Sequence, residues 1–172
     1  MAQPPRLSAI LLPWEKSVIY FVTLCVQARR KVLANAETFD AVRRTIRQLN
    51  KWRVLAAVVM PDHIHLIVSP MGDRGLSVGD FSHGFKRALR KTLKRQNWQW
   101  QRGCFDRLLR SDENLTSKWT YVQDNPVRHG LVKKAEDWPY YLDFVNITEG
   151  SCQLPLQPDQ SQELQSMGVA GR

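Results

Sequence analysis

The sequence predicts an α+β fold of the ferredoxin-like type, in which one antiparallel sheet carries helices on one face. Three observations lead to this fold. Hydrophobic patterns between residues 17 and 146 follow the order strand, helix, strand, strand, helix, strand, helix, which fits a βαββαβ arrangement with one further helix. The chain has 172 residues, enough for one domain with a substantial core. No internal repeat divides it, so we expect a single domain over 17–146.

The first half of the chain supplies three strands and one helix. Ser17–Gln27 is rich in β-branched and aromatic residues and is predicted to be the first strand. Ala36–Lys51 has apolar residues at helical spacing, with basic residues outside that stripe. Arg53–Met60 and His63–Ser69 are predicted to be two strands. The dipeptide Pro61-Asp62 between them is typical of a tight turn, so we expect a hairpin.

The second half adds two helices and a strand. Ser77 and Asp80 have the spacing of a capping box, so the second helix should begin there. Its apolar stripe consists of Phe81, Phe85, Leu89 and Leu93. Cys104–Arg110 is a short candidate strand. Asp112–Asp124 is predicted to be a third helix, ended by Asn125-Pro126 because the residue before a proline disfavours the helical conformation.

The two ends of the chain lack such patterns. Residues 1–16 contain three prolines and are expected to form an irregular leader. Residues 147–172 are rich in Gln, Pro, Ser and Gly and offer few apolar side chains to bury, so we expect a disordered tail.

Charge and composition favour an anionic partner, nucleic acid first of all. The chain has 25 Lys and Arg against 16 Asp and Glu, a net charge of +9, and a pI near 9.8. No apolar run approaches the ~20 residues of a membrane-spanning helix, and the start is too polar for a signal peptide. We therefore expect a cytoplasmic protein without membrane contact. Three distant cysteines provide neither a disulfide framework nor a Cys-type zinc site.

The clearest local feature is a pair of histidines two residues apart in a predicted strand. His63 and His65 project to the same side of that strand, while Ile64 points away. Two adjacent imidazoles can chelate one divalent ion, although both could also be ordinary sheet histidines. Zinc deaminases and helical metalloproteases are excluded because their H-x-E with P-C-x-x-C and H-E-x-x-H signatures are absent.

The third helix offers a second set of polar groups. Leu115, Trp119 and Val122 form one stripe that should pack on the sheet. Tyr121 and Asn125 are one turn apart on another face, with Lys118 beside them. This face could present a phenol and an amide oxygen to one site. Alternatively, Tyr121 is an interfacial tyrosine that packs its ring and exposes its hydroxyl.

Three segments together resemble the REP-associated tyrosine transposases, a family of single-tyrosine proteins with a His-hydrophobic-His motif. The segments are MPDHIHLIVSP, GCFDRLLRSDE and YVQDNPVRHGLV, and the resemblance runs from about Tyr20 to Val132. One departure is His129, where members often carry a small residue. It could affect local packing or add a polar group near the site.

The resemblance implies a metal-dependent endonuclease and strand transferase for single-stranded or hairpin DNA. It assigns the nucleophile to Tyr121, which would form a 5′-phosphotyrosine, and the metal site to His63, His65 and Asn125. Imidazole alone would suit zinc, but the amide and phosphate oxygens favour Mg²⁺ or Mn²⁺. A monomer or homodimer associated with the nucleoid fits this activity.

The second helix supplies a candidate DNA-binding face. Seven basic residues and no acidic residue lie between Lys86 and Arg102. We expect DNA phosphates to be bound by Lys86, Arg87, Arg90, Lys91, Lys94 and Arg95, together with Lys118. The alternative for this run is a solvated helix face. The alternative for the whole protein is a hairpin DNA- or RNA-binding module that does not cut.

Overall fold

The computed structural model describes residues 18–93, 97–109 and 112–144, with the backbone alone for 112–116. The predicted leader lies outside these residues, and so does the predicted tail. Among the described residues, no helix has both the length and the apolar character needed to cross a membrane.

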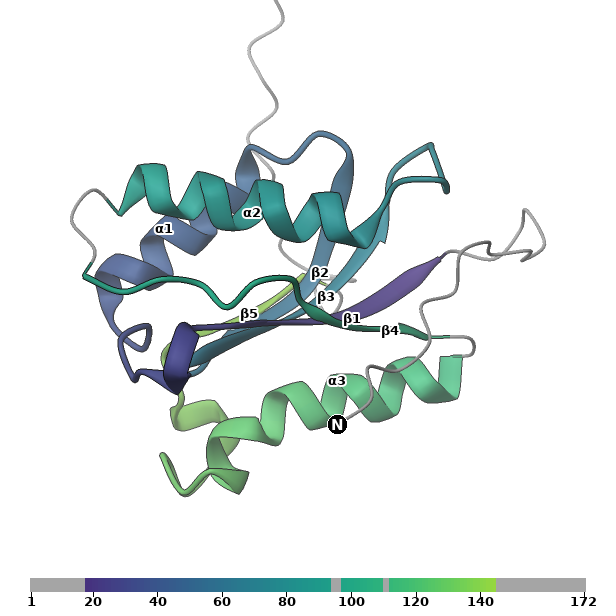
Figure 1. Cartoon of the computed structure of the whole chain (residues 1–172). Helices are drawn as coiled ribbons and strands as arrows, with labels where there is room; N and C mark the ends of the chain where they lie inside the picture. Colours follow the sequence, from purple (N-terminus) through teal and green to yellow (C-terminus); the bar gives the residue numbers. More distant parts are fainter. Residues whose placement is uncertain (1–17, 94–96, 110–111, 145–172) are drawn as a thin grey trace, which may run out of the picture.

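A five-stranded antiparallel sheet forms the centre of the fold, in the order β4-β1-β3-β2-β5 (Figure 1). Its strands are β1 (Ile19–Cys25), β2 (Trp52–Val59), β3 (His63–Pro70), β4 (Phe105–Leu109) and β5 (Tyr141–Asp143). The first four have the connectivity of a ferredoxin-like sheet, which confirms the predicted fold class. Sequence patterns did not predict β5, a three-residue strand that pairs with β2.

Two helices cover one face of the sheet and the third covers the other (Figure 1). The first pair is α1 (Ala36–Arg47) and α2 (Val78–Thr92), and the helix opposite is α3 (Asp112–Arg128). Asn35 and Ser77 cap α1 and α2, because their side chains accept hydrogen bonds from backbone N–H groups of the first turn. Two short 3₁₀ turns, Gln27–Arg29 and Ala135–Asp137, lie in connecting segments.

The third helix continues beyond Asn125, contrary to the prediction. Pro126 lies inside α3 and removes only its own N–H from the last turn. The hydrogen bond from the N–H of His129 to the carbonyl of Asn125 (3.0 Å) spans Pro126 and keeps the chain helical, while the bond from Leu131 to Pro126 (2.9 Å) closes the end of the helix. The side chain of Asn125 is therefore held by a continuing helix and not by a flexible helix end.

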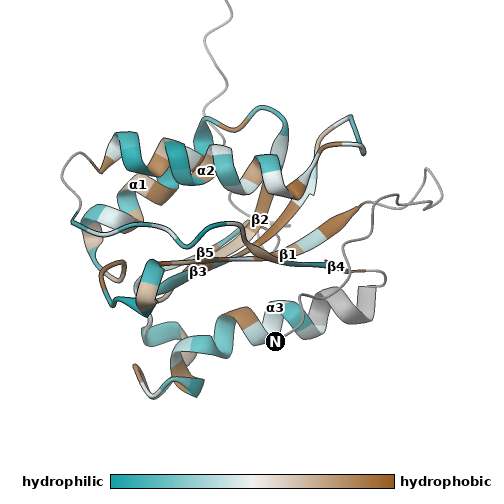
Figure 2. Ribbon diagram, in the orientation of Figure 1, coloured by the Kyte–Doolittle hydropathy of each residue, from teal (hydrophilic) through white to brown (hydrophobic). Residues whose placement is uncertain are grey.

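The two faces of the sheet carry separate hydrophobic cores. The larger lies under α1 and α2 and contains Val22, Leu24, Leu66 and Phe85 among others. The smaller lies under α3, where Trp119 and Val122 pack on Val58 and Ile67 as the predicted stripe requires. Figure 2 shows hydrophobic strands and largely hydrophilic outer helix surfaces. Because both faces are covered, β3 is buried from His63 to Val68.

Candidate active site

The two histidines lie side by side on the sheet face that α3 covers. The Pro61–Asp62 turn places His63 at the start of β3, and strand alternation puts His65 on the same side. Both side chains are buried. Their Nε2 atoms are 3.1 Å apart. Two nitrogens bound to one ion at about 2.1 Å are roughly 3.0 to 3.4 Å apart in octahedral or tetrahedral coordination, so this pair has a chelating geometry.

Hydrogen bonds at the other ring nitrogens orient this pair. The carboxylate of Asp62 can only accept, so Nδ1–H of His63 donates to its Oδ1 at 2.6 Å. Asp62 is held in turn by Arg29, at 2.9 Å. Nδ1 of His65 is 2.8 Å from the hydroxyl of Thr23 on β1. Because a hydroxyl both donates and accepts, Thr23 can support either neutral tautomer of His65, including the one that leaves Nε2 free for a metal.

Burial keeps both imidazoles neutral. It lowers the pKa of His63 below its ordinary value, although Asp62 opposes this effect. It lowers the pKa of His65 to about 2, and the nearby His63 adds to the decrease. A neutral imidazole is the form that binds a metal ion, so the pair can bind one without first releasing protons at neutral pH.

Tyr121 on α3 faces the histidine pair. Its ring centroid is 5.9 Å from that of His65 and 6.0 Å from that of Phe21, in edge-to-face contacts. Two cations lie over the same ring: Nζ of Lys118 at 5.0 Å and the guanidinium of Arg128 at 5.1 Å. Two positive charges that could receive a DNA phosphate thus lie close to the tyrosine ring.

Sequence reasoning missed Arg128. It lies seven residues after Tyr121, which is two helical turns and therefore the same face. The predicted end of the helix at Asp124 placed this residue outside it. A helix predicted to continue through Pro126 would have placed Arg128 on the same face as Tyr121.

Asn125 is a buried amide without a partner. Its side chain is 1% exposed, and neither Oδ1 nor Nδ2 has a hydrogen-bond partner among the described residues. It lies one turn from both Tyr121, which contacts His65, and His129, whose ring is 6.1 Å from that of His63. Buried polar groups are normally satisfied, so this amide is suited to a ligand that binds here.

Two imidazoles are the paired donors of this site, and the buried Asn125 amide is a further candidate donor. Within the described part of the chain, no three His, Cys, Asp or Glu side chains converge to hold a metal. A metal bound by the two histidines would need donors of another kind, and the Asn125 oxygen is the candidate on α3, one helical turn from Tyr121. His129 places a further imidazole beside the site, as its ring contact with His63 indicates.

The predicted DNA-binding residues of α2 divide into three groups. Arg87, Arg90 and Lys91 are exposed, as expected. Lys86 is buried, contrary to the expectation of an exposed face, because its ammonium donates to the carbonyls of Gln101 (2.8 Å) and Gly103. Lys94 and Arg95 lie outside the described residues.

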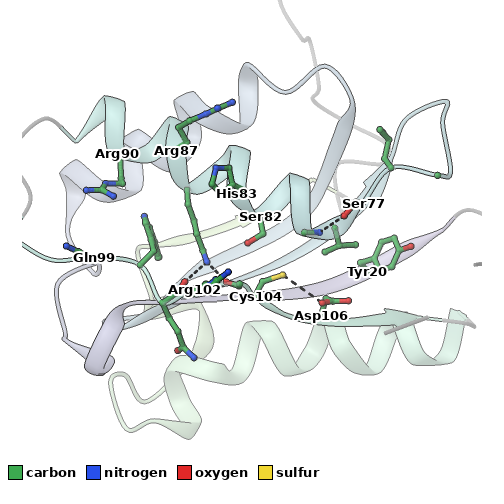
Figure 3. Close-up of a pocket in the computed structure, with 18 of the residues that line it drawn as sticks. Tyr20, Ser77, Ser82, His83, Arg87, Arg90, Gln99, Arg102, Cys104 and Asp106 are labelled. Atoms are coloured by element: carbon green, nitrogen blue, oxygen red, sulfur yellow. Dashed lines mark hydrogen bonds between the residues drawn. The ribbon is translucent and has the colours of Figure 1, made fainter. Parts of the chain in front are cut away.

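A groove of about 1500 Å³ runs beside α2 on the sheet face opposite α3. Figure 3 shows Arg87 and Arg90 on its helix side and Arg102 and Asp106 on its other side. Arg74 also lines it, so four guanidinium groups border one hollow.

Comparisons with known proteins agree on one family. The family described as "Transposase IS200 like" matches residues 15–109. A Haemophilus influenzae protein (strain ATCC 51907 / DSM 11121 / KW20 / Rd), provisionally named a REP-associated tyrosine transposase, is 29% identical over 139 residues, 73% of this chain and 79% of that protein. The REP-associated tyrosine transposase of Escherichia coli K12 is 28% identical over 141 residues, 78% of this chain and 82% of that protein.

A solved structure confirms the fold. It is that of a REP-associated tyrosine transposase bound to a REP hairpin, with a TM-score of 0.64 and 24% identity, and the match covers 82% of each chain.

Proposed function

Because the chain belongs to the family of IS200-like transposases, we propose that it cleaves and rejoins single-stranded DNA next to a hairpin. One observation carries the proposal: Tyr121 lies edge-on to His65 with Lys118 and Arg128 over its ring. These contacts support a site in which β3 supplies two nitrogens for a metal and α3 supplies a nucleophile and two cations for a phosphate. A protein that only bound DNA would not need this combination.

The reaction is a transesterification at phosphorus. The phenol oxygen of Tyr121 attacks the scissile phosphate, a new O–P bond forms, and the bond from phosphorus to the 3′ oxygen breaks. The phenol loses a proton and the departing 3′ oxygen gains one. The products are a 5′-phosphotyrosine and a free 3′-hydroxyl, a polarity taken from the resemblance. Since the number of phosphoester bonds is unchanged, a 3′-hydroxyl can reverse the step and rejoin a strand.

The proposed cofactor is Mg²⁺ or Mn²⁺. The residues present fit such an ion, because the paired Nε2 atoms have chelating geometry and the buried Asn125 amide has no hydrogen-bond partner among the residues that the structure describes. His63, His65 and Asn125 would hold it, and oxygen donors shift the preference away from zinc. When bound, the ion neutralises charge on the phosphate oxygens. Lys118 and Arg128 would hold the same phosphate against Tyr121.

The proposed substrate is a DNA hairpin with a single-stranded flank. A solved relative of the same fold is bound to a REP hairpin. In this chain, Arg87, Arg90 and Lys91 on α2 offer exposed cations for backbone phosphates. Lys94 and Arg95 remain predicted contacts, while the ammonium of Lys86 is already used inside the fold.

Covalent trapping tests this proposal. The wild type, incubated with Mn²⁺ and labelled hairpins bearing single-stranded flanks of varied sequence, should form an adduct that excess EDTA prevents. Tyr121→Phe keeps the ring, so binding should persist while adduct and cleavage disappear. Tyr140→Phe, with its ring on Phe39 and Trp138, is the control and should react normally. An adduct on another tyrosine would contradict the assignment, and binding without any adduct would favour the non-cutting module.

A further inference from the structure

Two neighbouring rows of paired side chains, one of which starts at His65, run across the sheet to its edge strand β4. In an antiparallel sheet, directly paired residues point to the same face. Thr23 of β1 pairs with His65 of β3 on one side and with Phe105 of β4 on the other. The next row joins Phe21 to Arg107 in the same way. Both rows lie on the α3 face, because Phe21 and His65 contact Tyr121 there.

Phe105 and Arg107 are exposed at the end of these rows. Phe105 is 53% exposed on β4, one of the two edge strands of the sheet. Arg107 is exposed beside it. A single exposed phenylalanine needs no explanation by itself. Phe105, however, lies two strand spacings from His65, which is about 10 Å. It is also next to Arg107, on the face of the sheet that carries the candidate catalytic groups.

The neighbouring charges also suit a polyanion. Phe21 lies beside Tyr121, and Nζ of Lys118 is 5.3 Å from the centre of the Phe21 ring. On the neighbouring strand β4, Phe21 is paired with Arg107. Asp106, the acidic residue between Phe105 and Arg107, points to the opposite face, where it lines the α2 groove. Phe105, Arg107, Phe21 and Lys118 therefore form a strip that combines an exposed aromatic ring with cations. Such a combination is typical of surfaces that bind unpaired nucleotides.

We propose that Phe105 stacks on an unpaired base adjacent to the phosphate attacked by Tyr121, and that Arg107 binds the phosphate of that nucleotide. The inference rests on the proposed function for its choice of ligand, single-stranded DNA. It adds a substrate-binding strip on β4 that fixes the position of the strand at the reaction centre. Stacking accepts every base, so the strip would position the strand without reading its sequence.

Photocrosslinking locates the base. The probe is an oligothymidine strand with one 5-iodouracil, bound to full-length Tyr121→Phe protein without metal so that no cleavage intervenes. Irradiation should attach the probe to the tryptic peptide 103–107, which contains Phe105. Crosslinks confined to other peptides would overturn the proposal.

Affinity variants give a second, independent test with the same probe. Phe105→Ala should weaken binding by roughly 5- to 100-fold, the usual loss for one stacked base, and Phe105→Trp should restore it. Phe144→Ala is a matched control, because Phe144 is 43% exposed next to the opposite edge strand and should leave binding unchanged. Equal affinity of Phe105→Ala and wild type would refute the strip. Because neither readout needs catalysis, failure of the cleavage proposal would be seen separately, as the absence of a wild-type adduct.

Discussion

At the scale of single residues, Asn125 shows a conflict between stability and binding. Its buried amide has no hydrogen-bond partner among the described residues, so it contributes a desolvation cost of about 1 to 3 kcal/mol without compensation there. An apolar side chain of similar size would avoid that cost but could not bind an ion. A purely structural asparagine would behave in the opposite way, because its replacement would break hydrogen bonds.

Asn125→Leu should therefore stabilise the metal-free protein by about 1 to 3 kcal/mol and weaken Mn²⁺ binding. Chemical denaturation in EDTA measures the first effect and titration calorimetry the second. Thr45→Val is the control, since Thr45 on α1 also has a buried oxygen without a partner among the described residues, but α1 covers the other face of the sheet. It should not change Mn²⁺ affinity. Unchanged Mn²⁺ affinity in Asn125→Leu would remove the amide from the metal site.

Arg128 is the residue that links the end of α3 to the chemistry. Its guanidinium lies over Tyr121 without covering other described aromatic rings, and it can move to a phosphate once DNA binds. Arg128→Ala should slow adduct formation roughly 10- to 100-fold at saturating DNA, the value of one charge-assisted hydrogen bond. Single-turnover kinetics measure this rate. Lys133→Ala, an exposed cation beyond the helix, should react at the wild-type rate, and an equally fast Arg128→Ala would exclude the guanidinium from the reaction.

At the scale of elements, Lys86 links α2 to the segment before β4 through hydrogen bonds. Its ammonium binds two backbone carbonyls there and burial lowers its pKa. Lys86→Met should destabilise the protein by about 1 to 3 kcal/mol, because the carbonyls lose their donor, while the salt dependence of DNA binding stays unchanged. Denaturation and binding at several salt concentrations measure the two effects. Lys91→Met, its exposed neighbour, should instead keep stability and lower the salt dependence. Unchanged stability and a lower salt dependence of DNA binding in Lys86→Met would instead show that Lys86 binds DNA phosphates.

The elements show how far sequence patterns reach. Periodicity predicted four strands, three helices and the Ser77 cap because strong local signals produced them. It failed at Pro126, since buried Trp119, Val122 and Asn125 hold the helix against the sheet and outweigh the local proline signal. It also failed at β5, whose three residues have no pattern of their own and become a strand only by pairing with the free edge of β2.

The candidate site divides in the same way. The pairing of His63 with His65 and of Tyr121 with Asn125 follows from strand and helix periods, which are local properties. The contacts of His65 with Thr23 and Tyr121 depend on the packing of three distant elements, which no spacing in the sequence reveals. The burial of Lys86 is likewise a tertiary property, since its partners are 15 and 17 residues away.

At the scale of the whole molecule, the sheet separates two cationic surfaces. The α2 groove lies on the face of α1 and α2, and the histidines and Tyr121 lie on the face of α3 (Figure 1). A DNA molecule that used both would have to pass around a sheet edge, and β4 is the edge that carries Asp106 toward one face and Phe105 toward the other. Affinity and chemistry should consequently depend on different residues.

Charge reversal on α2 tests this separation. Replacing Arg87, Arg90 and Lys91 together by Glu should weaken hairpin binding, and each lost phosphate contact should reduce the slope of log affinity against log salt by roughly 0.7 to 0.9. At saturating DNA the rate of adduct formation should remain that of the wild type, because the sheet lies between these residues and Tyr121. Affinity measured over a range of salt and single-turnover kinetics give the two quantities.

The control for that variant is Arg43, Arg44 and Arg47 replaced by Glu on α1, which are exposed and change the net charge equally. If α2 binds phosphates directly, the α1 variant keeps a nearly wild-type slope, since distant exposed charges are screened at physiological salt. Equal losses in both variants would mean that the net charge of +9 attracts DNA without a defined α2 surface. A slower adduct rate at saturation in the α2 variant would mean that DNA bound on one face positions the strand on the other, and the two surfaces would then act as one continuous substrate path.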